Sequence, residues 1–189
     1  MTKLAEENPK VPNFRSEAAY AQTRLSAVVR RLGRPAESRD LCERAIAVFE
    51  ALSQEDPKMP WYRFNLAESY LYRGLARRAL GDPAGTTADA RRALVLFEGL
   101  ESPSSWELYF AACCHAALAG LAGAGMSAGP AAAEADAAMA LLHQAVAKGY
   151  RNAAAFRTDD ALDPLRGRED FRLLMMDLAF PAEPFAAAR

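Results

Sequence analysis

The chain has 189 residues, of which 51% are hydrophobic and 25% are charged. Its 23 basic side chains nearly balance its 24 acidic ones, which excludes the strongly basic surface typical of nucleic-acid-binding proteins. This balance leads us to expect no nucleic-acid partner. No apolar stretch approaches about 18 residues and the N-terminal residues lack an apolar signal core, so we expect no membrane partner either.

The chain repeats itself at a constant shift of 48 residues. The matched pairs, which need no gap, include Pro9 with Pro57, Gly33 with Gly81, Pro35 with Pro83, Arg44 with Arg92 and Phe49 with Phe97. A fixed period of this size is typical of stacked helical repeats, in which each helix pair buries its apolar face against its neighbours. At the same shift Leu4 falls on Leu52, so we interpret residues 1–8 as the remnant of a preceding repeat helix, in a chain that starts inside a longer array.

The first full unit spans about residues 9–53. Its first helix is predicted from Asn13 to Leu32 and ends at Gly33, and Pro35 opens the second helix, where its missing N–H costs nothing. The second helix carries one core-facing stripe with helical spacing. That stripe consists of Leu41, Ala45, Val48 and Leu52, with Cys42 and Phe49 beside it.

The later units follow the same plan with increasing departures. The second spans about residues 56–100, and a third, degenerate unit spans about 104–149, with a loose Gly/Ala segment before a helix predicted from about Ala132 to Lys148. Residues 150–160 are expected to be irregular, Asp163-Pro164 to form a turn, and residues 160–178 to form a cap with a short helix from about Arg168 to Asp177. Residues 181–189 would form a tail.

These units predict an all-α fold without a sheet. We expect about seven helices in one repeat domain, residues 9–180, organised as a short α-solenoid of about three hairpins with long helices and a C-terminal capping helix. Because the first pair has no complete upstream neighbour, the apolar side of its first helix should be partly open.

The pattern within each unit resembles the tetratricopeptide repeat. Gly74, Gly81-Asp82-Pro83 and Ala93-Leu94 fall at that motif's spacing, although the period exceeds the usual ~34 residues and Arg77 stands where a tyrosine is usual. The chain is also similar to the C-terminal repeat tails of some large bacterial serine/threonine protein kinases. Segments that carry this similarity are Tyr109–Cys113, Asp163-Pro164-Leu165-Arg166 and residues 179–185.

No catalytic or cofactor motif accompanies this resemblance. The Gly-rich loop, His-Arg-Asp loop and Asp-Phe-Gly of a kinase do not occur, so the protein is expected not to be an enzyme and to need no cofactor. Cys113-Cys114-His115 would spread over a helix and cannot converge on one metal ion. The three cysteines, the third being Cys42, are too few for a disulfide framework, which favours reduced thiols and a cytoplasmic protein.

The repeat register places a set of aromatic and charged side chains on the groove-facing side of the first helices. This set consists of Tyr20, Arg24, Arg30, Arg31, Glu68, Tyr72 and Arg78. Arginine binds carboxylates in a bidentate fork, so such a groove would suit an extended peptide with acidic side chains or a free carboxylate. The simpler alternative is that these residues only solvate the helices or face a missing upstream repeat.

Two kinds of function are compatible with this sequence. One is a non-catalytic interaction scaffold that would bind a protein or a peptide, as the tail of a signalling kinase without its kinase domain would. The other is structural, either as the C-terminal cap of a longer superhelix or as a module that forms a homodimer through its N-terminal face.

Overall fold

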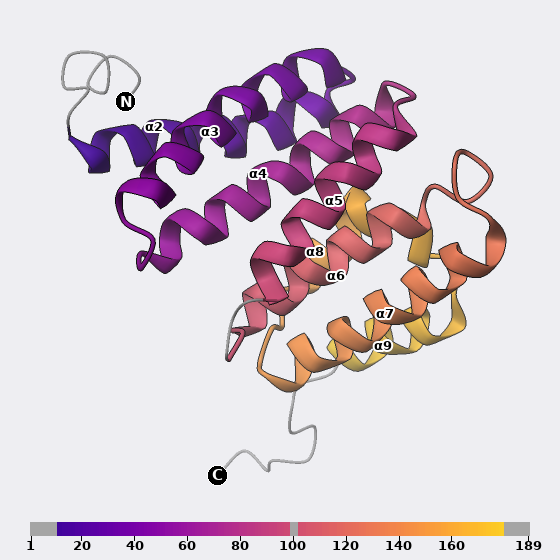
Figure 1. The fold of residues 1–189 in the computed structure, drawn as a ribbon. Helices are drawn as coiled ribbons and strands as arrows, with labels where there is room; N and C mark the ends of the chain where they lie inside the picture. Colours follow the sequence, from indigo (N-terminus) through magenta and orange to yellow (C-terminus); the bar gives the residue numbers. More distant parts are fainter. Residues whose placement is uncertain (1–10, 99–101, 180–189) are drawn as a thin grey trace, which may run out of the picture.

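The computed structural model describes residues 11–98 and 102–179, which fold into helices without a β-sheet (Figure 1). The predicted all-α fold is therefore confirmed, whereas the predictions for residues 1–8 and 181–189 concern residues outside the described ranges. The helices, in chain order, are α2 (Pro12–Arg31), α3 (Pro35–Glu55), α4 (Pro60–Ala79), α5 (Pro83–Glu98), α6 (Ser105–Ala119), α7 (Ala128–Ala147), α8 (Ala153–Thr158), the 3-10 helix η1 (Asp160–Leu165) and α9 (Glu169–Ala179). Among these helices, none is both long and apolar enough to cross a membrane.

Proline and glycine set the boundaries of the repeated helices. Proline occupies the start of α2, α3 and α4, where the ring fits the helix and no hydrogen bond is lost. Gly33 and Gly81 follow the first helix of each unit with φ angles of 77° and 75°, a left-handed conformation that glycine adopts without strain. The same signals therefore produce the same turn in both units.

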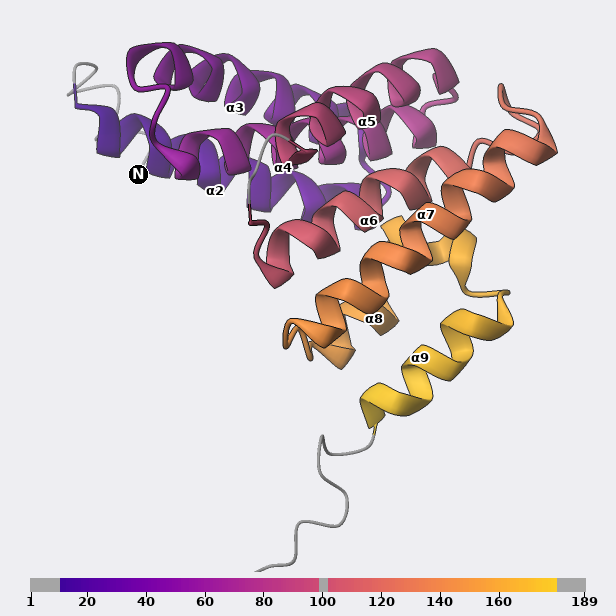
Figure 2. The same cartoon turned by 60° about the horizontal axis from the view of Figure 1, so that its bottom comes forward.

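The helices stack in sequence as neighbouring pairs. α2 packs on α3, α4 on α5 and α6 on α7, while α3 contacts α4 and α5 contacts α6. The first helices of the pairs are α2, α4 and α6; α4 contacts both α2 and α6, and the three form one layer, which is seen beneath α3 and α5 in Figure 2. This sequential packing is consistent with the predicted solenoid-like helical repeat fold.

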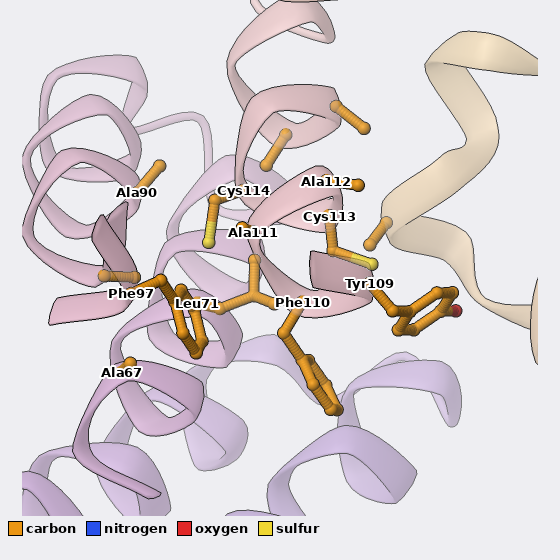
Figure 3. Close-up of a cluster of buried hydrophobic side chains, with 14 of the residues drawn as sticks. Ala67, Leu71, Ala90, Phe97, Tyr109, Phe110, Ala111, Ala112, Cys113 and Cys114 are labelled. Carbon is orange, nitrogen blue, oxygen red and sulfur yellow. The ribbon is translucent and has the colours of Figure 1, made fainter. Parts of the chain in front are cut away.

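The equivalent phenylalanines of the two matched units lie in the core. Phe49 of α3 is 0% exposed and Phe97 of α5 is 5% exposed. α6 lies at the centre of the same core, where Cys114 points to the side of Phe97 and Cys113 points with Tyr109 to the opposite side (Figure 3). All three cysteines are free and buried, and burial raises the pKa of the Cys42 thiol to about 11.

α2 keeps part of its apolar surface open, as the repeat pattern predicts. Leu25, Val28 and Leu32 are exposed on α2, whereas Ala19 and Val29 of the same helix are buried. A helix buries only the faces that meet a neighbour, and α2 meets α3 and α4.

The C-terminal third differs from the predicted boundaries. α7 begins at Ala128 instead of about Ala132, because Pro130 is tolerated within the first turn of a helix. Residues expected to be irregular form the short helix α8, and Asp163-Pro164 lies inside η1 instead of forming an isolated turn. Asn152 and Asp159 explain these two elements, since their side chains accept hydrogen bonds from the backbone N–H groups of Ala155 and Ala161.

Candidate functional site

An open cavity of about 480 Å³ lies across the layer of first helices. Side chains from α2, α4 and α6 and from the residues before α6 line it. We call it the aromatic groove, and its lining consists of Tyr20, Arg24, Pro60, Trp61, Phe64, Glu68, Ser104, Trp106, Glu107 and Phe110.

Aromatic rings from three successive repeat units line this groove in two contacting groups. The ring centroids of Tyr20 and Trp61 are 5.5 Å apart, and those of Phe64 and Phe110 are also 5.5 Å apart. Trp106 stacks on Phe110 at 6.3 Å. Trp61 is 41% exposed and Trp106 is 52% exposed, although large aromatic side chains usually contribute to cores. The groove therefore presents aromatic surface to solvent.

A pair of opposite charges lies within the aromatic groove. Arg24 forms an ion pair with Glu68, whose side chain is 1% exposed. The guanidinium carbon of Arg24 also lies 5.4 Å from the ring centroids of both Tyr20 and Tyr72, and its Nη2 donates a hydrogen bond of 3.4 Å to the Tyr72 hydroxyl. Arg24 is therefore held by a carboxylate and by two aromatic faces.

A second carboxylate belongs to the helix cap at the edge of the groove. Ser104 caps α6, and its side chain accepts a hydrogen bond of 3.3 Å from the backbone N–H of Glu107. In return, Oε2 of Glu107 accepts a 2.5 Å hydrogen bond from the backbone N–H of Ser104. This reciprocal capping box fixes the Glu107 carboxylate beside Trp106.

The remaining predicted residues lie at a second, smaller cavity. Arg30, Arg31 and Tyr72 line it together with Asp159 and Asp160, and its volume is about 170 Å³. Arg30 is buried, and its two terminal guanidinium nitrogens, Nη1 and Nη2, donate to the Asp160 carboxylate, with 2.8 Å between Nη2 and Oδ1. Nη2 of Arg78 donates to the backbone carbonyl of Asp160 at 3.3 Å.

Two adjacent aspartates at this cavity have opposite electrostatic environments. Burial alone would raise the pKa of Asp160, but the hydrogen bond and the charge of Arg30 hold that pKa below its ordinary value. Burial raises the pKa of Asp159, although hydrogen bonds from the Ala161 backbone and the Tyr109 hydroxyl oppose this shift. Asp160 is therefore stabilised as an anion, whereas Asp159 is not.

The structure thus divides the sequence-predicted set between two places. Tyr20, Arg24 and Glu68 line the aromatic groove, while Arg30, Arg31 and Tyr72 line the second cavity. Arg78 contacts the same η1 residue as Arg30. Three of the four predicted arginines, Arg24, Arg30 and Arg78, bind acceptors of this chain, and Arg31 is exposed.

Comparisons with known proteins give no further assignment. Searches against protein-family models, curated proteins and solved structures find no match.

Within residues 11–98 and 102–179, no three or more His, Cys, Asp or Glu side chains are grouped so that they could hold a metal ion. Nδ1 of His115 instead lies 2.6 Å from Oε2 of Glu134, which also pairs with Arg91.

Four aromatic residues of the groove were missed in the sequence-based set. These are Trp61 and Phe64 of α4 and Trp106 and Phe110 of α6. The repeat register that selected Tyr20 could have found them if it had been extended to the starts of α4 and α6. Their signal was hidden because a tryptophan or phenylalanine on a helix is ordinarily interpreted as core.

Proposed function

We propose that this protein is a non-catalytic interaction module that binds a segment of a partner protein in the aromatic groove. The observation that carries the proposal is the series of aromatic rings from three repeat units, with two tryptophans exposed beside an open cavity. Exposed aromatic residues beside a groove are typical of binding surfaces, because they bury large areas at little cost in side-chain entropy.

An extended peptide is the occupant that fits this groove best. The lining comes from α2, α4 and α6 in turn, so the surface is elongated across helices instead of closed around a small molecule. The aromatic and charged side chains of the lining offer both apolar contact and hydrogen bonding. The free, buried cysteines suit a reducing compartment, so we place this interaction in the cytoplasm.

The first prediction tests the groove with a peptide-display selection on the full chain. Peptides recovered on the wild-type protein should bind the Trp61→Ala/Trp106→Ala double variant at least about tenfold more weakly, because aromatic anchors dominate such surfaces. A matched control is Leu173→Ala/Met176→Ala, which removes two exposed apolar side chains from α9.

Binding would be measured by fluorescence anisotropy, and thermal unfolding would verify that each variant is folded. The control should bind as the wild type does. Recovered peptides that bind the tryptophan double variant within twofold of wild type would locate binding outside the aromatic groove.

A further inference from the structure

The charges in the aromatic groove are unequal. One guanidinium, that of Arg24, accompanies two carboxylates, those of Glu68 and Glu107. Apolar and aromatic walls concentrate the field of an unbalanced charge, since they polarise less than water does. The groove therefore favours an occupant that carries positive charge.

Glu107 is the groove carboxylate that an occupant can reach. Both carboxylate oxygens of Glu68 are buried, and Arg24 already pairs with Oε1. Glu107 is only partly buried, and its Oε2 accepts a hydrogen bond from the backbone N–H of Ser104. A carboxylate can accept several hydrogen bonds, so Glu107 can also accept from N–H groups of an occupant.

The aromatic lining narrows the choice of cation. The guanidinium of Arg24 already lies over the faces of Tyr20 and Tyr72, so aromatic rings at this site accommodate a planar guanidinium. A quaternary ammonium would also contact aromatic faces but has no N–H to donate. Lysine donates but is a compact, strongly hydrated charge that stacks less well.

Building on the proposed function, we infer that the partner segment presents an arginine side chain to the aromatic groove. Its guanidinium lies against the rings of Trp61 and Trp106 and donates toward Glu107. An acidic segment is disfavoured, because Arg24 and Arg30 are already neutralised by Glu68 and Asp160.

The second prediction tests this inference with the peptides recovered in the display selection. We expect arginine to be enriched at one position, and replacing it by citrulline, which is neutral and nearly isosteric, should weaken binding about tenfold. Added salt should weaken the binding of the arginine peptide more than the binding of its citrulline counterpart.

Glu107→Gln identifies the groove carboxylate in a double-mutant cycle. Glutamine at this position preserves the capping box but removes the charge. The ratio of the dissociation constants of the citrulline and arginine peptides should therefore shrink by at least about threefold. The matched control is Glu169→Gln, which neutralises another carboxylate in the first turn of a helix, α9, and should leave the difference unchanged.

The two proposals fail in different ways. If recovered peptides require Trp61 and Trp106 but are enriched in Asp or Glu, or bind equally well with citrulline, the arginine inference is overturned while the peptide-binding function stands. If no peptide depends on the tryptophans, both are overturned.

Discussion

At the scale of single residues, the contrast between Asp159 and Asp160 shows how position decides the effect of a charge. Asp160 accepts a bidentate contact from buried Arg30, while Asp159 is a helix cap that also accepts a 3.0 Å hydrogen bond from the Tyr109 hydroxyl. A cap needs an acceptor but not a charge, whereas a buried guanidinium needs an anion. Neighbouring residues of the same type therefore contribute differently to stability.

The third prediction follows from this contrast. At pH 7, Asp160→Asn should lower the free energy of unfolding by about 1–3 kcal/mol, less than for a fully buried pair because the Asp160 side chain is 31% exposed. Asp159→Asn should be neutral or stabilising, since Oδ1 of asparagine can still accept from the Ala161 N–H, its Nδ2 can donate to the Tyr109 hydroxyl oxygen, and no buried charge remains. Urea unfolding measures the free energy of unfolding of both variants. Equal losses of stability would contradict the conclusion that only Asp160 stabilises the fold as an anion.

The pH dependence of the two variants should also differ. Because the pKa of Asp160 is lowered on folding, its contribution is present above the ordinary carboxyl pKa and is lost as the pH falls through the folded value. The pKa of Asp159 is raised on folding, so its ionisation weakens the fold as the pH rises past the ordinary carboxyl value. The deficit of Asp160→Asn should accordingly vanish in acid, where any advantage of Asp159→Asn should vanish too.

At the scale of helices, the sequence predicted the two matched units closely and the last third poorly. The proline and glycine signals placed α2 within one residue at each end and α3 at its first residue, because both residue types act locally. α8 and η1 have no such periodic signal: they are short, and their caps are single polar side chains. The hydrogen bonds of η1 to α2 and α4 depend on tertiary packing, which local patterns do not encode.

The same limit applies to the candidate site. The register found Tyr20, Arg24 and Glu68 because groove-facing positions recur with the helical period. It could not separate them from Arg30, since only the folded chain brings Asp160 onto that arginine from 130 residues away.

The fourth prediction concerns the open side of α2. Val28 is 46% exposed and its neighbour Val29 is 4% exposed, so both alanine substitutions gain the same helix propensity but only one removes buried methyl groups. Val29→Ala should be less stable than Val28→Ala by about 1–2 kcal/mol. Chemical denaturation measures the difference; if Val28→Ala is the more damaging variant in dilute monomeric protein, the α2 face is assigned wrongly.

At the scale of the whole molecule, the C-terminal segment contacts helices of all three repeat units, so the packing is not limited to neighbouring pairs. In an ordinary repeat array each unit contacts only its neighbours. Here Asp160 of η1 binds Arg30 of α2 and, through its carbonyl, Arg78 of α4, while η1 also packs on α6. This segment covers the arginine-rich end of the first-helix layer, and the aromatic groove is the part that stays open.

The fifth prediction tests the central claim, that the open part of the first-helix layer is the binding surface. Hydrogen exchange of the full chain would be measured by mass spectrometry with and without a peptide recovered by selection. Slowed exchange is expected near Tyr20, at the start of α4 and in the first turns of α6, where the groove lining lies. Protection confined to α3, α5 or α9, with these three segments unchanged, would contradict it.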